Sequence, residues 1–392
     1  MTLKSDCTLR LGWVVNGNED YGSAASMEEI GDRLLERGGQ PFAFALDCGP
    51  FIERVARQSW EVIDLKSPDQ AAAMSRRPQG RIDAARRATR LVKLERALGE
   101  HVIRHSIDVI VTRSGGLLPL AGAAARRAEV PSFWYMAGSI PNGLHGILSR
   151  FYYRRVRKKY NISVIGNSRY TLGTVGTLSG DEIVVPVPIS LAPFLDTDKP
   201  KNGEGVRTKY PANFLISARL VPMKGQLEFL RAFRRVHDSG EAMRLVLAGD
   251  GDKEYESELK REAETIGGPQ SVVFLGKRND VPALMNSADV VVSPSIKPES
   301  FGRVCVEAQA AGRPVLATAL GGPAETVTDG VTGWLISGGS VSKMEGGIRR
   351  ALGDRRRWGE MGIAGRERAL RHYRGDILAD QLIDHVTAHS GT

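Results

Sequence analysis

The stretch ADVVVSPSIKPESFGRVCVEAQAAGRPVLAT, residues 288–318, contains the pattern that decides the fold. An apolar run at 288–294 is followed by a helical pattern at 302–311 and a second apolar run at 314–318. Short apolar runs that alternate with amphipathic helices are typical of parallel strands, which helices bury on both faces. The stretch therefore predicts a strand, a covering helix and a second strand parallel to the first.

The same alternation extends over almost the whole chain. In the first half we expect strands at 9–15, 41–46, 107–112, 131–136, 162–166 and 182–186. In the second half we expect strands at 212–217, 243–249, 271–276, 288–294, 314–318 and 333–336. Helical patterns fill the intervals, among them 24–37, 225–238 and 302–311, and residues 354–388 are typical of two final helices.

The segment 186–211 interrupts the alternation, because it is rich in proline, glycine and charge and has no sustained period. We therefore predict an α/β protein with two Rossmann-like doubly wound domains that face each other across a cleft. The first domain is expected at 1–195, a linker at 196–211 and the second domain at 212–372. A C-terminal helix at 373–392 is expected to pack back on the first domain.

The composition is that of a soluble globular protein, with 392 residues, 42% hydrophobic and 25% charged. A chain of this length exceeds the size at which one hydrophobic core stops growing, which also favours two domains. Neither a long apolar run nor a secretory signal pattern occurs in the sequence. The three cysteines, Cys7, Cys48 and Cys305, are far apart, which argues against a disulfide framework and a zinc site. We therefore expect a cytoplasmic protein.

The formal net charge is +9, and most of the cationic excess lies in the first half. Such an excess attracts anions, which include phosphorylated small molecules, anionic lipid and nucleic acid. The run RFYYRRVRKKY at 150–160 places cations among aromatic residues in a helical stretch. One interpretation is peripheral contact with the inner membrane surface, and the other is a solvated helix face. Nucleic-acid binding is disfavoured, because no recognised module accompanies the charge.

Two glutamates flank the start of the helix expected at 302–311. Glu299, Ser300 and Phe301 occupy the turn before Gly302, where free backbone N–H groups form a natural anion site. Glu307 lies about 7.5 Å farther along the helix axis. Carboxylates accept hydrogen bonds from paired hydroxyls, so an anionic ligand with hydroxyls at both ends, such as a nucleotide sugar, would match this layout. The alternative is that Glu299 caps the helix and Glu307 lies on its solvent face.

Two further turns are expected at the same edge of the second sheet. Arg219 and Lys224 follow the strand at 212–217, and Gly225 opens the next helix. A third turn brings Gly321-Gly322 and Glu325 to the end of another strand. Arginine and lysine can both bind a phosphate, so three turns that converge at one edge favour an anion site.

Residues 213–336 resemble the C-terminal half of the family 4 retaining glycosyltransferases, which have the two-Rossmann GT-B fold. The resemblance rests on an ordered set of residues: Arg219, Lys224-Gly225, Gly249-Asp250-Gly251, Glu299, Phe301-Gly302, Glu307-Ala308, Gly312, Pro314-Val315, Gly321-Gly322, Glu325, Asp329-Gly330 and Gly333. The N-terminal half matches the family only in strand order. The resemblance implies an acceptor-side first domain and a second domain that binds a nucleotide-sugar donor.

The resemblance also implies roles for single residues. Arg219 and Lys224 would bind the donor diphosphate and Glu299 the transferred sugar, so these three are the candidate catalytic residues. Glu307 would hold the ribose hydroxyls, and the nucleobase would lie near Lys277-Arg278. The candidate donor-binding residues are Gly22, Arg278, Ser300, Phe301, Gly302, Arg303 and Glu307.

The first domain departs from the family pattern. Its opening turn lacks the usual Gly-Gly pair, although Gly22-Ser23 still precedes a helix. Many relatives place a histidine after the strand that corresponds to 131–136, whereas Gly138 and Ser139 follow here and the next histidine is His145. We keep Ser23, Gly138, Ser139 and His145 as candidate acceptor-side residues. The alternatives are a helix-start glycine at Gly22 and a structural histidine at His145.

We therefore expect a metal-independent retaining glycosyltransferase of the hexosyltransferase type, without a cofactor. It would use a UDP-sugar by family default and a hydroxyl acceptor such as a glycan, a lipid-linked saccharide or a small natural product. Asp196 with Asp198, and Asp250 with Asp252, are treated as coincidental carboxylate pairs. An epimerase and a non-catalytic nucleotide-sugar binding protein remain alternatives, whereas a dehydrogenase is disfavoured, because no Gly-x-Gly-x-x-Gly follows the first strand of either half.

Overall fold

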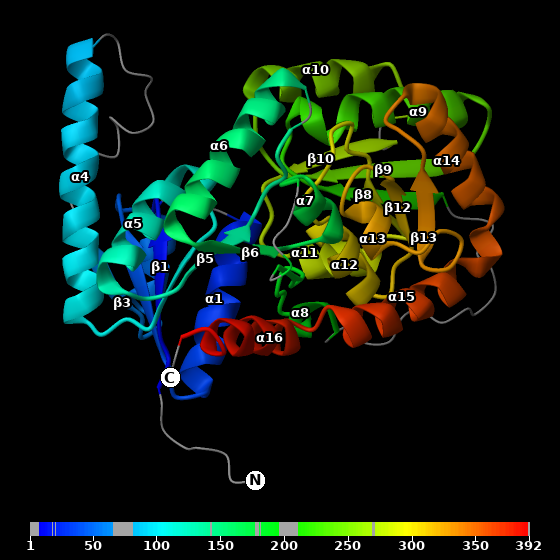
Figure 1. Ribbon diagram of the computed structural model, residues 1–392. Coiled ribbons are helices and arrows are strands. Elements are labelled where there is room, and N and C mark those ends of the chain that lie inside the picture. The colour runs from blue at the N-terminus through cyan, green and yellow to red at the C-terminus, as the bar shows by residue number, and fades with distance from the viewer. Residues whose placement is uncertain are drawn as a thin grey trace. The chain divides into compact units, whose positions relative to one another are not determined.

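The computed structural model describes residues 8–390, except 18, 20, 66–80, 142, 177–179, 181, 196–210 and 269–270. The chain forms two compact units (Figure 1). The first unit contains Met1–Ile189 and Gly375–Thr392, and the second contains Ser190–Arg374. Each unit has its own parallel sheet with helices, which confirms the expected α/β class with two doubly wound sheets.

The first sheet has the strand order β3-β2-β1-β4-β5-β6-β7, and every recorded pair is parallel. Its strands are β1 (Arg10–Val15), β2 (Gln40–Ala45), β3 (Glu61–Asp64), β4 (Val109–Thr112), β5 (Ser132–Met136), β6 (Ile162–Gly166) and β7 (Ile183–Val184). The helices of this unit are α1 (Tyr21–Glu36), α2 (Pro50–Val55), α4 (Arg81–Arg104), η1 (Gly115–Leu117), α5 (Leu118–Ala128), α6 (Leu144–Tyr160), α7 (Arg169–Gly173) and α16 (Gly375–Thr387).

The second sheet has the order β10-β9-β8-β11-β12-β13 and is also parallel. Its strands are β8 (Ala212–Ser217), β9 (Met243–Ala248), β10 (Val272–Gly276), β11 (Val290–Ser293), β12 (Val315–Thr318) and β13 (Gly333–Ile336). Its helices are α8 (Ala192–Leu195), η2 (Pro222–Lys224), α9 (Gln226–Asp238), α10 (Lys253–Glu264), α11 (Val281–Ser287), α12 (Arg303–Ala310), α13 (Pro323–Thr326), α14 (Val341–Gly353), η3 (Arg355–Arg357) and α15 (Trp358–His372). The strand order reverses between β8 and β11, so the chain leaves these two strands toward opposite faces of the sheet.

Three local expectations were wrong. Strand β3 was not predicted, because it lies at the sheet edge, where Glu61 is exposed and the other three residues are only half-buried, and because it begins and ends with acidic residues. Helix α1 begins at Tyr21, so Gly22 lies inside its first turn and does not precede the helix. Strand β7 contains only Ile183 and Val184 of the expected 182–186.

The boundary between the units lies at Ile189, before the expected boundary at 195. Helix α8 belongs to the second unit, because it packs on α11 and α12. Arg366 of α15 donates hydrogen bonds to the carbonyl oxygens of Phe194 and Leu195, at 3.4 and 3.2 Å. The linker expected at 196–211 lies, apart from its last residue, outside the described residues.

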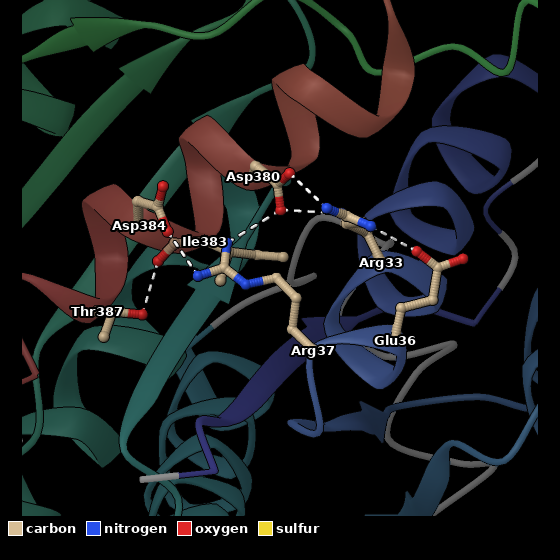
Figure 2. Close-up of polar contacts among 7 residues, drawn as sticks. All are labelled: Arg33, Glu36, Arg37, Asp380, Ile383, Asp384 and Thr387. Carbon is tan, nitrogen blue, oxygen red and sulfur yellow. Dashed lines mark hydrogen bonds and ion pairs between the residues drawn. The ribbon is translucent and has the colours of Figure 1, made fainter. Parts of the chain in front are cut away.

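The final helix α16 completes the core of the first unit. Leu378, Leu382 and Ile383 are buried in one cluster with residues of α1 and the first sheet. Beside this apolar contact, Arg33 forms a forked contact with Asp380, at 2.9 and 2.8 Å (Figure 2). Arg37 reaches Asp380 at 3.0 Å and Asp384 at 2.7 Å. Burial therefore attaches α16 to α1, and the charge network fixes their register.

In the described part of the chain, no helix combines the length and the apolar composition needed to cross a membrane.

The α1–α16 network gives a pH-dependent prediction. The hydrogen bond from Arg33 lowers the pKa of Asp380 below its ordinary value of 3.8. The folded chain therefore holds this proton less tightly than the unfolded chain, so the stabilisation is complete above about pH 5 and is lost as the pH falls through the lowered pKa. We expect Asp380→Asn to lower the Tm by about 2 °C at pH 7 and to have no effect in strong acid.

Asp384→Asn is the matched control, since Asp384 makes one ion pair and its side chain is 65% exposed, against 29% for Asp380. Its Tm change at pH 7 should be smaller than that of Asp380→Asn. Thermal unfolding followed by circular dichroism across a pH series measures both variants. A Tm difference for Asp380→Asn that stays constant down to strong acid would contradict the assignment.

Candidate active site

Three loops of the second unit meet at the carboxyl edge of its sheet. The loop after β8 runs from Ala218 to Gly225, the loop after β11 from Pro294 to Gly302, and the loop after β12 from Ala319 to Gly322. Strands β8, β11 and β12 are neighbours in the sheet, and parallel strands end at one edge. The structure thus brings together the turns that the sequence placed at three separate strand ends.

An ion pair joins the first two loops. The Lys224 ammonium lies 2.8 Å from Oε1 of Glu299, and their side chains are only 21% and 14% exposed. The Ser295 hydroxyl, which is buried in the loop after β11, donates to the same carboxylate oxygen. Both contacts reach Oε1, so Oε2 can accept a hydrogen bond from a ligand hydroxyl. Glu299 therefore does not cap α12, and that alternative is excluded.

The backbone of Glu299 is held by the third loop. Its N–H donates to the Leu320 carbonyl at 3.0 Å, and its carbonyl accepts from the Gly322 N–H at 2.8 Å. These two bonds form a short parallel bridge between Glu299 and Gly321 outside the sheet. The carboxylate therefore extends from a backbone that is fixed on both sides.

Gly225 permits the close approach of the first two loops. Its φ is +69°, and a Cβ at this position would lie 2.1 Å from the Pro294 carbonyl oxygen. Any other residue would meet both left-handed strain and a backbone clash. The glycine therefore allows Lys224 to reach the loop after β11.

The second carboxylate is on α12. This helix begins after Gly302, whose φ of +84° is left-handed, and no side chain caps its first turn. Arg303 donates to Glu307 Oε1 at 2.6 Å, and the Glu307 residue is only 8% exposed. Glu307 therefore does not lie on the solvent face, which excludes the second part of the alternative. Phe301 is buried against Tyr373, with the ring centroids 5.7 Å apart, while Ser300 is half-buried in the same turn.

The remaining cations differ in their surroundings. Arg219 is exposed, and among the described residues no carboxylate pairs with its guanidinium. Its backbone is fixed by Gln226, whose amide donates to the Arg219 carbonyl at 2.7 Å. Arg278 is also exposed but forms a forked contact with Asp280, at 2.7 and 2.6 Å, which lowers the pKa of Asp280. The Arg219 guanidinium is therefore available to bind an anion, whereas the Arg278 guanidinium is already paired with the Asp280 carboxylate.

Asp252 and Cys305, two further residues of the second unit with reactive side chains, have structural roles. The Asp252 carboxylate accepts from the Tyr255 N–H at 2.8 Å and caps α10, while Asp196 and Asp198 lie outside the described residues. Burial raises the pKa of the Cys305 thiol to about 12, so this cysteine is a neutral core group. In the described residues, no group of three or more His, Cys, Asp or Glu side chains could hold a metal ion.

The candidate residues of the first unit follow strands β1 and β5, at the carboxyl edge of the first sheet. Gly22 is half-buried in the first turn of α1, and the side chain of Ser23 lies outside the described residues. Gly138 and Ser139 follow β5, and a Cβ on Gly138 would meet open space. His145 is exposed in the first turn of α6. The structure places these residues in a different unit from Glu299 and Lys224.

Sequence analysis missed Glu19 and Ser295. The Glu19 carboxylate accepts from the N–H groups of Asn16 and Gly17, at 2.9 and 2.8 Å, in the turn after β1. An anion that binds at these two amides must displace it. Ser295 could have been found as a hydroxyl that directly follows the end of an expected strand and precedes Glu299.

The second unit thus presents paired cations and carboxylates within one set of loops. Lys224 and Arg219 offer positive charge, and Glu299 and Glu307 each have a carboxylate oxygen with capacity for a hydroxyl. Such an edge can bind a ligand that combines phosphate with hydroxyl groups.

Comparison with known proteins agrees with this chemistry. The family described as Glycosyl transferases group 1 matches residues 199–368. The GDP-mannose-dependent alpha-(1-6)-phosphatidylinositol monomannoside mannosyltransferase of Mycolicibacterium smegmatis is 32% identical over 323 residues, 74% of this chain and 79% of that protein. The protein of the same name from Mycobacterium tuberculosis is 32% identical over 210 residues, 50% of this chain and 54% of that protein.

Solved structures agree in fold. Anabaena Alr3699/HepE in complex with UDP matches with a TM-score of 0.81 and 19% identity, over 97% of this chain and 100% of that chain. The sucrose-phosphate synthase of Thermosynechococcus elongatus matches with a TM-score of 0.73 and 18% identity, over 97% and 99%. This chain therefore belongs to the glycosyl transferases group 1 family, the family 4 type of glycosyltransferases with the GT-B fold.

Proposed function

We propose that this glycosyltransferase transfers mannose from GDP-mannose to a hydroxyl group of a lipid acceptor of the phosphatidylinositol mannoside class, with retention of configuration at the anomeric carbon. The observation that carries the proposal is the paired arrangement of Lys224 and Glu299 at the switch point of the second sheet. The donor and the acceptor class come from the relatives, because the first four are GDP-mannose-dependent mannosyltransferases of this class.

The UDP-sugar expected from the sequence is revised to GDP-mannose for this reason. The relatives give no support to an epimerase or to a non-catalytic binding protein.

The donor diphosphate is proposed to bind between Arg219, Lys224 and the first turn of α12. Negative charge grows on the diphosphate as the bond to the sugar breaks, and fixed cations stabilise that charge without reorganisation. Because Lys224 is already held by Glu299, its ammonium lies at the loop edge before the donor arrives. Arg219 and Lys224 thus supply the electrostatic part of the catalysis.

The two carboxylates are proposed to bind hydroxyl groups. Glu299 keeps its Oε1 contacts with Lys224 and Ser295 and accepts a mannose hydroxyl at Oε2. Glu307 keeps its contact with Arg303 and accepts from the ribose at its second oxygen. Each carboxylate is held in place by a cation, which fixes its orientation toward the sugar.

Binding of the donor should stabilise the folded chain. A ligand at one hundred times its Kd adds about 2.7 kcal/mol to the stability of the folded chain and raises the Tm by a few degrees. We expect GDP and GDP-mannose to raise the Tm more than UDP and UDP-glucose at the same concentration, in thermal unfolding of the full chain. Arg219→Ala and Glu307→Ala should abolish this shift.

Glu345→Ala is the matched control for Glu307→Ala, because Glu345 makes an equivalent i,i+4 ion pair with Arg349 on α14. This variant should keep the full shift with GDP. A larger shift with UDP than with GDP would reject GDP-mannose as the donor, and a shift that survives Glu307→Ala would reject the ribose assignment.

Turnover should depend on the negative charge of Glu299. Glu299→Gln keeps the shape of the side chain but removes its charge, so it weakens both the hold on Lys224 and the acceptance of a sugar hydroxyl. We expect kcat/KM for mannose transfer to fall about a hundredfold. The measurement is the release of GDP from GDP-mannose with a phosphatidylinositol mannoside acceptor in detergent, with the product configuration read by NMR.

Glu262→Gln is the control, since the Glu262 side chain is also 14% exposed and pairs with Arg231 in the same unit. It should leave kcat/KM unchanged. Equal rates for Glu299→Gln and the wild type would reject the role of Glu299, and an inverted product would reject retention.

A further inference from the structure

Helix α6 of the first unit has an outward face that the proposed site does not use. Leu144, Ile147, Leu148 and Phe151 are 74%, 57%, 61% and 68% exposed. Their spacing of three and four residues places them on one side of the helix. In a protein whose other large apolar residues are mostly buried, a contiguous apolar stripe indicates a contact surface.

The same side of α6 becomes cationic in its second half. Arg155 and Lys158 continue the spacing from Phe151, and both are exposed. We call the set Leu144, Ile147, Leu148, Phe151, Arg155 and Lys158 the α6 outer face. The helix contains no aspartate or glutamate to neutralise these cations internally.

The opposite side of α6 anchors the helix to its unit. Val156 is buried, and the Tyr153 ring packs on Trp134 of β5 with the centroids 4.9 Å apart. Arg157 turns inward to Glu182, at 2.7 Å, and is therefore engaged within the fold. Because these contacts fix the rotation of the helix, the outer face points away from the core of the first unit.

We propose that the α6 outer face docks the protein on an anionic lipid bilayer. A helix that lies in a membrane interface needs an apolar stripe to enter the acyl boundary and cations to attract anionic head groups, and this face supplies both. A second copy of the chain is a poorer occupant, because α6 contains no aspartate or glutamate, so two such faces in contact would offer no carboxylate to the cations of either copy. A nucleic acid would leave the apolar half in water.

The position of α6 in the fold links this surface to the acceptor side. Helix α6 follows β5 and precedes the parallel strand β6, so it starts at the carboxyl edge of the first sheet and returns to the amino edge. Its apolar half is therefore the half nearer Gly138 and Ser139. This step rests on the proposed function. If the chain glycosylates a lipid, docking through the α6 outer face would bring the head group of the acceptor lipid to the carboxyl edge of the first sheet.

The test is sedimentation of the full chain with vesicles of phosphatidylcholine alone, or mixed with an equal amount of phosphatidylglycerol. We expect binding to the mixed vesicles only, and weaker binding as salt increases. The double variants Leu148→Ser with Phe151→Ser, and Arg155→Gln with Lys158→Gln, should each weaken binding about tenfold or more.

The controls change exposed residues of the second unit: Val331→Ser with Ile363→Ser, and Lys343→Gln with Arg356→Gln. They should bind vesicles like the wild type, and all four double variants should keep the wild-type Tm. Binding of the α6 variants equal to the wild type would overturn the proposal. So would equal binding to neutral vesicles, or binding to an oligonucleotide without binding to vesicles.

The outcome is separable from that of the proposed function. Release of GDP with a detergent-dispersed acceptor does not require a bilayer, so the α6 variants should keep that activity. A chain that binds anionic vesicles through α6 but transfers no mannose would retain the docking surface and reject the function. A chain that transfers mannose equally well with intact and altered α6 on vesicles would reject the docking surface alone.

Discussion

All strands of a parallel sheet end at one edge, and in the second unit that constraint decides where charge can gather. The strand order reverses between β8 and β11, so the loops that follow these strands lead to opposite faces of the sheet. Lys224 and Glu299, 75 residues apart in the chain, meet there at 2.8 Å. Gly225 lets the first loop approach the second, and the bridge from Glu299 to Gly321 fixes the third.

Lys224, Arg303 and the two glutamates at this edge are paired before a ligand is present. An isolated carboxylate or ammonium of low exposure would be costly, whereas the pairs Lys224 with Glu299 and Arg303 with Glu307 satisfy both partners. A donor with phosphate and hydroxyl groups would add contacts to both members of each pair without separating them. These ion pairs avoid unpaired buried charge when no ligand is bound, and they keep charged groups at the edge that can recognise a ligand.

Much of this arrangement could be predicted from the sequence, because buried parallel strands leave short apolar runs with helices between them. The runs that became β8, β11 and β12 are of this type, and the turns after them were placed correctly. Strand β3 was missed, because an edge strand that begins with an exposed Glu61 and ends with a half-buried Asp64 gives no apolar run. The burial of Glu307 and the pairing of Lys224 with Glu299 depend on packing between distant segments, which local patterns do not encode. The choice between UDP and GDP was beyond the sequence, since the residue types expected at this edge recognise phosphate and hydroxyl groups, which both nucleotides share.

The attachment of α16 to the first unit has a consequence for biosynthesis. The second unit is formed by one continuous segment, whereas the first also needs Gly375–Thr392, which a ribosome makes after the whole second unit. The second unit can therefore fold during translation. The apolar surface of α1 that packs against Leu378 and Leu382 stays exposed to solvent until α16 has been made. A message truncated shortly after residue 374 would yield a finished second unit beside an unfinished first one, and such a product is a natural target for chaperones and proteases.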